Sequence, residues 1–396
     1  MGGIYTLGIQ PDTVLSGNVI HNVGCYEGST GYGGWGIYLD EGSSEILVEK
    51  NLVYDCSSQT FHQHYGKDNM IRNNIIAFGG EGQFRITRNE DHNSLFLYNN
   101  ILVGDEMQIL VSFANINLGG YVGAKLTNVK TGEVICDSIS YFLGANKHVP
   151  PAKGDIPNRY KDKIGKTEFD FDTKETERTL WYKGAYKGKS VEVKVQMDIP
   201  EGLENITTIF PFSEDNTKYF MTTKQMCMPC EGEFRFGDYV YKFSKDNSFC
   251  TLDWGRVNTV HKMVWYWGSG NKYITDENGK KHLFGFEITW AIGDESNATE
   301  TCIFYDGKVH KIGAVDVEKF PKDRYLEEWK FISEDGRFNM TMKPTLDNHT
   351  DVDFKIGRMN CHQIFGNWSG DVTLDDGTKI VIDDLFTFCE YVENRW

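Results

Sequence analysis

The chain has 396 residues, which is enough for two or three domains, and 14% of them are aromatic. Its formal net charge of −16 argues against nucleic acid and against anionic membrane surfaces, because phosphate groups are bound by clustered Lys and Arg. No apolar run reaches the roughly 18 residues that a membrane helix requires. The expected partner is therefore a small molecule or a glycan.

The nine cysteines are an odd number and have no disulfide-framework spacing, which favours reduced thiols. Cys227 and Cys230 form a lone C-x-x-C without a second pair or a His partner, so neither zinc nor redox chemistry is predicted. The opening MGGIYTLGIQPD has no secretory pattern. We therefore expect a cytoplasmic protein without cofactor or metal, with truncation of a secreted β-helix parent as the alternative.

Residues 1–106 contain a repeat. Aligning four short apolar segments brings Asn18, Asn51, Asn74 and Asn100 into register, at separations of 33, 23 and 26 residues. Short strands recurring at this period, each next to an Asn in a turn, are typical of a parallel β-helix. The sequence therefore predicts stacked coils with an internal Asn ladder and an apolar interior.

A second set of strands keeps the same register and puts Tyr38, His62 and Arg85 in one column. Asp40 and His64 lie two residues further along their strands, so they face the same way. These five side chains are expected on one outer face of the coils, where a carbohydrate could lie.

The stretches YGGWGIYLDEGSS and FHQHYGKDNMIRNNI resemble the C-terminal coils of right-handed parallel β-helix proteins of glycoside hydrolase family 141. The resemblance implies that Asp40 is an acid or nucleophile and that His62 and His64 hold sugar hydroxyls. Glycosidases need two carboxyls, and Glu41 or Glu81 is the candidate partner of Asp40. The alternative is a set of surface residues on an inactive remnant.

After residue 106 the pattern changes to longer alternating strands. EGEFRFGDYVYKF predicts a hairpin, and DGK at 306–308, EDG at 334–336 and DDG at 375–377 predict further hairpin turns. The fold class is therefore all-β, with a short parallel β-helix followed by two antiparallel barrel or sandwich domains, 107–245 and 246–396.

The stretch TLDWGRVNTVHKMVWYWGSG concentrates acid, base and indole side chains. Asp253 is the candidate catalytic acid, and strand alternation predicts that it points into a cavity near Trp265 or Trp267 while Arg256 points elsewhere. A structural Asp253–Arg256 ion pair is the alternative. The candidate ligand-binding residues of this region are Trp254, Arg256, Trp265, Tyr266, Trp267, Asp294 and Glu300.

LDWGR, WYWGSG, FGFEITWAIGDESNATE, FYDGKVHKI, HQIFGNWSG and the terminal ENRW resemble the domain of unknown function 2804 family, from about Gln108 to Trp396. That family has no settled activity. The resemblance implies paired lipocalin-like barrels related to those of carotenoid hydratase and of lipocalin-fold cyclases.

Three functions follow. The first is an enzyme that uses Asp253 for acid-catalysed hydratase or isomerase chemistry on an apolar or amphipathic molecule. The second is a binding module that uses the same cavity without chemistry, and the third is a carbohydrate-active protein that uses the coil face. An acid that faces the cavity without a bonded cation would favour the first. The uncapped first coil also predicts self-association.

Overall fold

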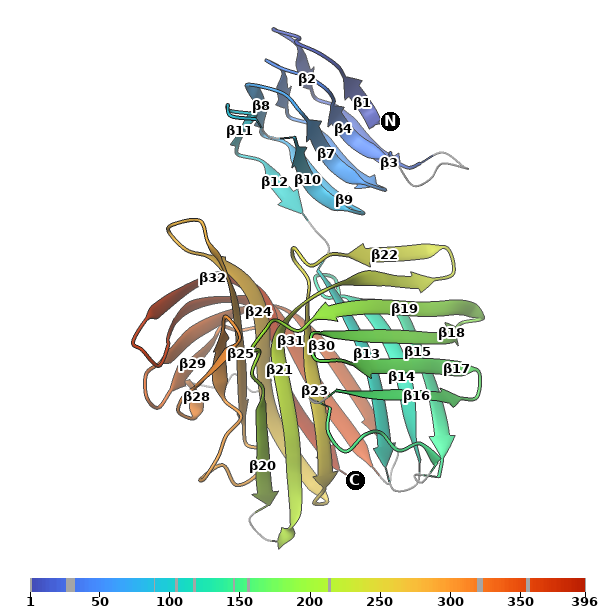
Figure 1. Cartoon of the computed structure of the whole chain (residues 1–396), viewed down its shortest axis with the longest axis vertical. Coiled ribbons are helices and arrows are strands. Elements are labelled where there is room, and N and C mark those ends of the chain that lie inside the picture. Colours follow the sequence, from blue (N-terminus) through green and yellow to red (C-terminus); the bar gives the residue numbers. More distant parts are fainter. Residues whose placement is uncertain are drawn as a thin grey trace. The chain divides into compact units, whose positions relative to one another are not determined.

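The computed structural model describes residues 2–25, 33–88, 90–103, 106–116, 119–144, 147–154, 157–212, 215–318, 323–353 and 357–395. The chain divides into two compact units, residues 1–106 and residues 107–396. Every element assigned within the described ranges is a β-strand, so the predicted all-β class is confirmed (Figure 1). Among these residues, none forms a helix with the length and apolarity needed to cross a membrane.

The first unit consists of three parallel sheets, each built from one strand of every turn of the chain. The first sheet contains β1 (Gly2–Thr6), β4 (Trp35–Leu39), β7 (Gln59–His64) and β10 (Gly82–Thr87). The second contains β2 (Val14–Ser16), β5 (Leu47–Glu49), β8 (Asn69–Arg72) and β11 (Leu95–Tyr98). The third contains β3 (Val19–Val23), β6 (Leu52–Cys56), β9 (Ile75–Gly79) and β12 (Ile101–Val103).

The predicted register of this unit is confirmed. Tyr38 pairs with His62, and His62 pairs with Arg85, on parallel neighbouring strands. The Asn ladder is also present: Asn51 Nδ2 donates to Asn74 Oδ1 at 2.9 Å, and Asn74 Nδ2 donates to Asn100 Oδ1 at 2.9 Å. Apolar side chains fill the space between the three sheets, among them Ile37, Leu39, Val48, Val53, Phe61, Ile71 and Ile76.

The second unit contains three antiparallel sheets. The first has β13 (Met107–Ile116), β14 (Gly119–Asn128) and β15 (Glu133–Leu143). The second has eight strands: β16 (Asn158–Ile164), β17 (Thr167–Thr173), β18 (Glu177–Tyr186), β19 (Lys189–Asp198), β20 (Ile206–Phe212), β21 (Asp215–Phe236), β22 (Tyr239–Phe243) and β23 (Phe249–Asn258).

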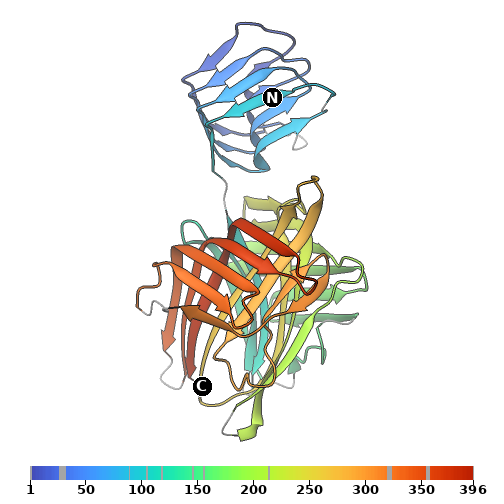
Figure 2. The same cartoon turned by 90° about the vertical axis from the view of Figure 1, so that its left-hand side faces the viewer.

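The third sheet of this unit has nine strands and curls into a half-barrel (Figure 2). Its strands are β24 (Lys262–Thr275), β25 (Lys281–Trp290), β26 (Cys302–Tyr305), β27 (Lys308–Lys311), β28 (Val315–Glu318), β29 (Trp329–Ser333), β30 (Phe338–Asp353), β31 (Arg358–Thr373) and β32 (Lys379–Arg395). The predicted hairpins are confirmed, since β21–β22, β26–β27, β29–β30 and β31–β32 pair as antiparallel neighbours.

Strand β21 connects the parts of the second unit. It pairs with β20 and β23 through its first half and with β19 and β22 through its second half, so the eight-stranded sheet runs across residue 245. The expected division of this unit into two barrels at that residue stays a prediction.

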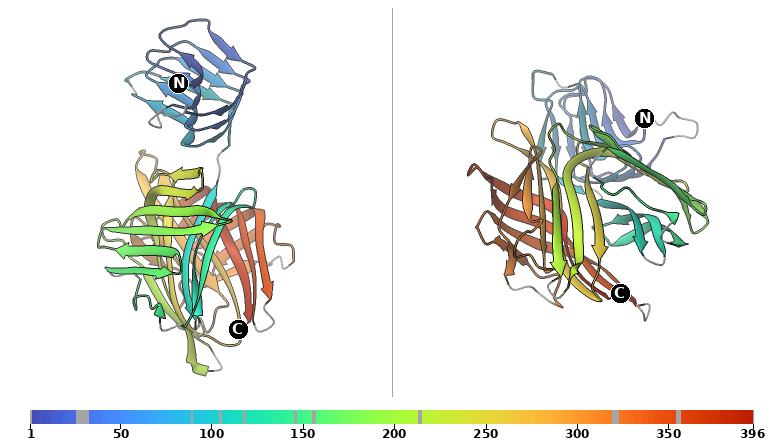
Figure 3. Two further views of the ribbon diagram at one scale, coloured as in Figure 1. Left: turned by 90° about the vertical axis from the view of Figure 1, so that its right-hand side faces the viewer. Right: turned by 60° about the horizontal axis from the view of Figure 1, so that its bottom comes forward.

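The eight- and nine-stranded sheets also pack against each other. A small apolar cluster of Ile206, Met226, Cys227, Cys302 and Phe304 lies between them. Gly285 of β25 permits this close approach, because a Cβ there would lie 2.8 Å from Cys227 Sγ. Figure 3 shows the long strands of the second unit from two further directions.

Candidate functional site

The candidate site begins with a cross-strand pair in the eight-stranded sheet. Lys224 of β21 lies opposite Asp253 of β23, and Lys224 Nζ is 2.8 Å from Asp253 Oδ1. The Lys224 side chain is only 5% exposed, whereas that of Asp253 is 48% exposed. A buried ammonium therefore meets a carboxylate at the edge of the solvent.

The nine-stranded sheet forms the opposite wall. Trp267 of β24 lies between Thr289 of β25 and Glu390 of β32 in one cross-strand row. The Lys224 ammonium stands 3.9 Å from the centroid of the Trp267 ring, within the range of a cation–π contact. The two sheets enclose a cavity of about 180 Å³ lined by Phe220, Lys224, Asp253, Val257, Met263, Trp265, Trp267, Thr289, Ile292, Glu300 and Glu390.

Three further carboxyls surround the ammonium, and all are buried. Glu287 is fully buried, and its Oε1 lies 3.7 Å from Lys224 Nζ. Glu300 is 1% exposed and accepts a hydrogen bond from Thr289 Oγ1 at 2.6 Å. Glu390 is 8% exposed and accepts hydrogen bonds from Trp265 Nε1 at 3.1 Å and Gln363 Nε2 at 3.4 Å.

Burial shifts the protonation of these groups. It raises the pKa of Glu390 to about 7, even though the Trp265 hydrogen bond and the charge of Lys224 oppose the shift. Burial also raises the pKa of Glu300, and it raises that of Glu287 well above its usual range. Burial alone would lower the pKa of Lys224, but the surrounding carboxylates outweigh it and raise that pKa. The Lys224 ammonium therefore stays charged, while the three buried carboxyls keep their protons to a higher pH than an exposed Glu does.

Several buried polar atoms at this place have no hydrogen-bond partner among the described residues. They are both carboxyl oxygens of Glu287, Glu300 Oε2, Thr222 Oγ1 and Trp267 Nε1. Trp267 nevertheless favours the charged form of Glu287, so its N–H faces that carboxyl without reaching normal hydrogen-bond geometry. Unsatisfied buried groups are costly, and their concentration here points to a functional site.

The structure brings Asp253, Trp265, Trp267 and Glu300 together at the cavity, as the sequence predicts for Asp253. The cavity lies between the two sheets, however, and not inside the C-terminal half-barrel where we expected it. The reason is that β23 belongs to the eight-stranded sheet and presents Asp253 to the back of the nine-stranded one.

The other predicted residues of this region lie elsewhere. Trp254 and Arg256 project from the opposite face of β23, and Arg256 Nη2 lies 3.5 Å from Pro151 O, so no Asp253–Arg256 pair forms. Tyr266 faces the interior of the half-barrel, where it stacks on Trp290 at 4.6 Å. Asp294 accepts a hydrogen bond from Ser296 N in a turn, and it does not line the cavity.

On the coil face, Asp40 is held by two hydroxyls. Tyr5 Oη donates to Asp40 Oδ2 at 2.5 Å and Tyr38 Oη donates to Oδ1 at 2.7 Å. Partial burial raises the pKa of Asp40, but these hydrogen bonds outweigh it and lower that pKa overall. A carboxyl in this state is a poor proton donor. Glu81, its candidate partner, accepts a hydrogen bond from Ser58 Oγ at 2.6 Å, and Glu41 lies near Arg88.

The histidines of this face are also engaged. His62 Nε2 and His64 Nδ1 bond to the same Thr87 hydroxyl, at 3.0 and 2.7 Å. Burial lowers the pKa of His62 to about 4, so this side chain is neutral at pH 7. Trp35 packs on the His62 ring. Of the five predicted side chains, Arg85 is the most exposed. The described residues contain no group of three or more His, Cys, Asp or Glu side chains that could hold a metal ion.

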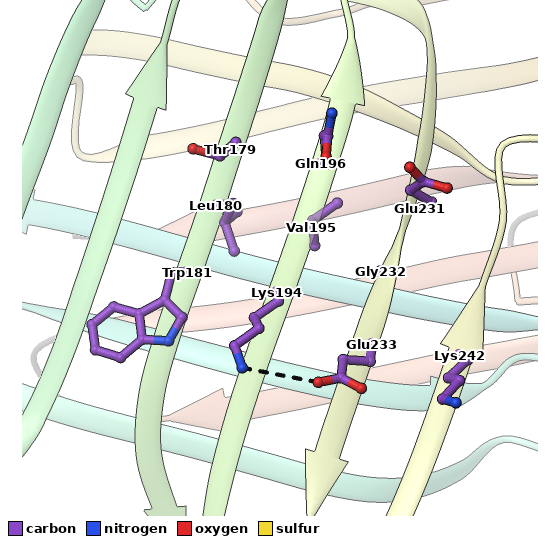
Figure 4. A pocket seen from close by; sticks show the side chains of 10 residues that line it. All are labelled: Thr179, Leu180, Trp181, Lys194, Val195, Gln196, Glu231, Gly232, Glu233 and Lys242. Carbon is purple, nitrogen blue, oxygen red and sulfur yellow. Dashed lines mark ion pairs between the residues drawn. The ribbon is translucent and has the colours of Figure 1, made fainter. Parts of the chain in front are cut away.

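A second hollow lies on the outer face of β18, β19, β21 and β22 (Figure 4). Its polar groups are paired on the sheet surface: Lys194 Nζ is 4.0 Å from Glu233, and Trp181 Nε1 donates at 3.0 Å to Glu192, which lies beside the hollow on β19. Such a self-paired, solvent-facing surface is typical of a sheet exterior, and we assign no ligand to it.

The family described as a domain of unknown function, DUF2804, matches residues 85–396. The chain belongs to the DUF2804 family. The match begins at Arg85, earlier than the predicted start near Gln108, and it contains every residue of the cavity between the sheets.

Two solved structures are similar to this DUF2804 chain at low identity. Kievitone hydratase from Nectria haematococca aligns with a TM-score of 0.37 and 10% identity, over 74% of this chain and 84% of the hydratase chain. A Nitrosomonas europaea protein provisionally called AttH aligns with a TM-score of 0.36 and 8% identity, over 73% and 87%. No curated protein matches the chain, so the resemblance of residues 1–106 to glycoside hydrolase family 141 stays a prediction.

Three residues of this DUF2804 site were not predicted from the sequence: Lys224, Glu287 and Glu390. Two of them could have been recognised in the sequence, because Glu287 in FGFEITW and Glu390 in FCEYV are single acids inside apolar strands. An acid at such a position is buried unless the strand lies at a surface, and buried acids are enriched at functional sites. Lys224 follows polar residues in MTTKQM, so nothing in the sequence indicated that it is buried.

Proposed function

We propose that the cavity between the two sheets binds a small amphipathic molecule and catalyses proton transfer to it, as in a hydration or isomerisation. The observation that carries this proposal is Glu390: it is buried and lines the cavity, no cation in the described part of the chain forms an ion pair with it, and burial raises its pKa to about 7. A general acid–base group works best when its pKa lies near the working pH.

Glu390 replaces Asp253 as the proton-transfer residue. Asp253 is 48% exposed and its carboxyl is occupied by an ion pair with Lys224 at 2.8 Å. Among the described residues no Lys or Arg forms an ion pair with Glu390, whose hydrogen-bond donors are the neutral Trp265 and Gln363. Asp253 instead fixes the position of Lys224 beside Trp267.

The lining of the cavity fits an amphipathic ligand. Phe220, Val257, Met263 and Ile292 supply apolar surface, and Lys224, Thr289 and the carboxyls supply polar groups. A dry cavity of about 150 Å³ in another protein accepts one benzene ring. The cavity of about 180 Å³ therefore matches a single ring or a short branched chain.

In a hydration, protonated Glu390 would transfer its proton to one carbon of a double bond. Water would add to the other carbon and return a proton to the Glu390 carboxylate, so the enzyme is restored. The Trp265 N–H would stabilise the carboxylate between the two steps, and the faces of the indoles would stabilise the cationic intermediate. A binding module without chemistry remains the second candidate, because the same cavity would serve it.

We further assign the coils of residues 1–106 to the right-handed parallel β-helix class and the sheets of residues 107–396 to the lipocalin-like barrels. The recurring parallel strands and the Asn ladder support the first assignment. The long antiparallel strands that curl around separate apolar cores support the second. A sugar-binding role of the coil face is a weaker proposal, since Asp40, His62 and His64 are bonded to neighbouring side chains.

The test follows proton transfer directly. The protein is incubated in D₂O with a panel of single-ring enones, alkenols and allylic alcohols, and deuterium incorporation at carbon is measured by mass spectrometry. We expect incorporation with the wild type and with Glu201→Gln, an exposed control, and none with Glu390→Gln. Compounds that bind to the wild type without gaining deuterium would instead establish the binding module.

A further inference from the structure

The cavity has a surplus of acid that its own cation does not balance. Asp253, Glu300 and Glu390 line it, and Glu287 lies behind Lys224, so four carboxyls surround one ammonium in the described part of the chain. Four carboxylates cannot all ionise around one cation in a space with little water. Some of the carboxyls must therefore be protonated unless a second cation binds in the cavity.

Three described groups already surround the Lys224 ammonium, two of them carboxyls. Its Nζ lies 2.8 Å from Asp253 Oδ1, 3.7 Å from Glu287 Oε1 and 3.9 Å from the centre of the Trp267 ring. A carboxylate or phosphate ligand would have to displace Asp253 and would meet the remaining acids. The cavity therefore disfavours anions.

Glu300 supplies the complementary acceptor. The residue is 1% exposed and lines the cavity. Its Oε1 accepts the Thr289 hydroxyl at 2.6 Å, while its Oε2 is buried near the Thr222 hydroxyl without a hydrogen bond of normal geometry among the described residues. A donor placed in the cavity would satisfy that oxygen, and a charged donor would satisfy it best.

We infer that the ligand of this site carries an ammonium group on a small apolar body, with the ammonium directed at Glu300 and Glu390. This inference rests on the proposed function and names its substrate class: with the ammonium bound, ionised Glu390 would first take a proton from one carbon of the ligand and then return it to another, as in an isomerisation. The apolar body would contact Trp265, Phe220 and Met263 at the cavity wall. With the ligand bound, two ammonium groups would face four carboxyls.

The binding is coupled to pH. The groups that face Glu390 are Trp265 on β24, Lys224 on β21, Asp253 on β23, and Cys361 and Gln363 on β31. Burial gives Glu390 a pKa of about 7, and a bound ammonium favours its ionised form. Affinity for an amine should therefore rise as the pH increases through 7, since fewer protons must then be released. A neutral ligand gains nothing from that ionisation.

The experiment compares 4-fluorobenzylamine, 4-fluorobenzyl alcohol and 4-fluorobenzoate by ¹⁹F NMR titration of the full chain at pH 6, 7 and 8. We expect the amine to bind about tenfold more tightly than the alcohol at pH 8, as one charge-assisted hydrogen bond predicts. Its affinity should increase severalfold from pH 6 to pH 8, and the benzoate should not bind.

A matched pair of variants places the effect at the cavity. Glu300→Gln should weaken the amine more than the alcohol, and Glu201→Gln should change neither; the wild-type pH series decides the matter if Glu300→Gln does not fold. Equal or tighter binding of the alcohol at all three pH values would overturn the ammonium inference and leave the proposed function standing. Failure of all three compounds to bind would count against the cavity as a ligand site, and so against the proposed function itself.

Discussion

Lys224 and its four neighbouring carboxyls show how burial turns ordinary residues into proton carriers. An exposed Glu is ionised at pH 7, but removal of water destabilises the charge and shifts the proton equilibrium. Here burial raises the pKa of Glu390 to about 7, and the charge of Lys224 opposes the shift only in part. Burial, more than the position of Lys224, thus gives Glu390 a pKa near neutrality.

The first prediction concerns Glu390 and stability. Its folded pKa of about 7 lies above the ordinary 4.5, so the folded state keeps a proton that the unfolded state has lost. The stabilisation that protonated Glu390 gives to the folded state is therefore fully present below pH 4.5 and is lost as the pH rises through 7. At 1.36 kcal/mol per pKa unit, the loss amounts to about 3 kcal/mol. Glu390→Gln should remove this part of the pH dependence.

Urea denaturation of wild type and Glu390→Gln between pH 4.5 and pH 8 measures the difference. The two curves should diverge by about 3 kcal/mol across this range, with the wild type losing more stability. Parallel curves would mean that Glu390 titrates normally in the folded protein.

The second prediction concerns Asp253. From the sequence alone, Asp253→Asn should cost less than about 1 kcal/mol because no buried charge is left unpaired. The structure changes that expectation, since Lys224 is 5% exposed and loses its partner at 2.8 Å. Because Glu287 can ionise in its place, we expect a loss of about 1–3 kcal/mol, below that of a fully broken buried pair.

Thermal unfolding of Asp253→Asn, Lys224→Met and the double variant forms a cycle that measures this coupling. We expect the double variant to lose much less stability than the sum of the losses in the two single variants. Additive effects would show that the ion pair contributes nothing to stability.

At the scale of elements, the bulge in β21 brings the two sheets of the second unit together. The pairing of β21 with β23 shifts between Gln225 and Met228, and Cys227 adopts a positive φ of 59°. The freed Cys227 N–H donates to Asn271 Oδ1 of β24 at 2.7 Å, which ties the two sheets directly. β-Bulges often re-aim side chains at functional sites, and this one follows Lys224 by one residue.

The third prediction belongs to the Asn ladder of the coils. Asn74 Nδ2 donates to Val48 O and Asn100 Oδ1, and its Oδ1 accepts from Asn51 N and Nδ2. Asn74→Ala leaves these buried partners unsatisfied and should cost about 1–3 kcal/mol.

Hydrogen-exchange mass spectrometry of Asn74→Ala should then show faster exchange across residues 46–101. The control variant Asn297→Ala, at an exposed position, should leave the exchange of these peptides unchanged. Unchanged protection of the coil peptides would mean that apolar packing alone holds the turns together.

At the scale of the whole molecule, the three sheets of the coils each end on a strand of the first turn in the described part of the chain. β1, β2 and β3 are the outermost strands of their sheets, and the described residues provide no further strand beside them. Exposed apolar side chains accompany these edges, including Leu7, Ile9, Val14 and Val19. Unpaired parallel edges with apolar flanks are prone to association.

The fourth prediction is therefore concentration-dependent self-association of the full chain through this edge. Sedimentation velocity should show a rising average mass for the wild type and a monomer for Ile9→Lys/Val19→Lys. Val381→Lys, which removes an equally exposed apolar side chain from β32, should behave as wild type. A wild type that stays monomeric at every concentration would contradict the prediction.

The sequence by itself determined the periodic features of this protein. The spacing of Asn18, Asn51, Asn74 and Asn100 predicted the register of the coils, and Asp-Gly turns predicted the hairpins, because both depend on local backbone geometry. Alternation along β23 likewise predicted that Asp253 and Arg256 would face opposite ways.

Only the tertiary structure decided what Asp253 meets. Its partner Lys224 is 29 residues earlier in the chain, and Glu390 is 137 residues later, so no local pattern joins them. The eight- and nine-stranded sheets bring them together by packing back to back. The protonation of each carboxyl then depends on burial and on distance to one ammonium, which are properties of the packed sheets and not of any strand alone.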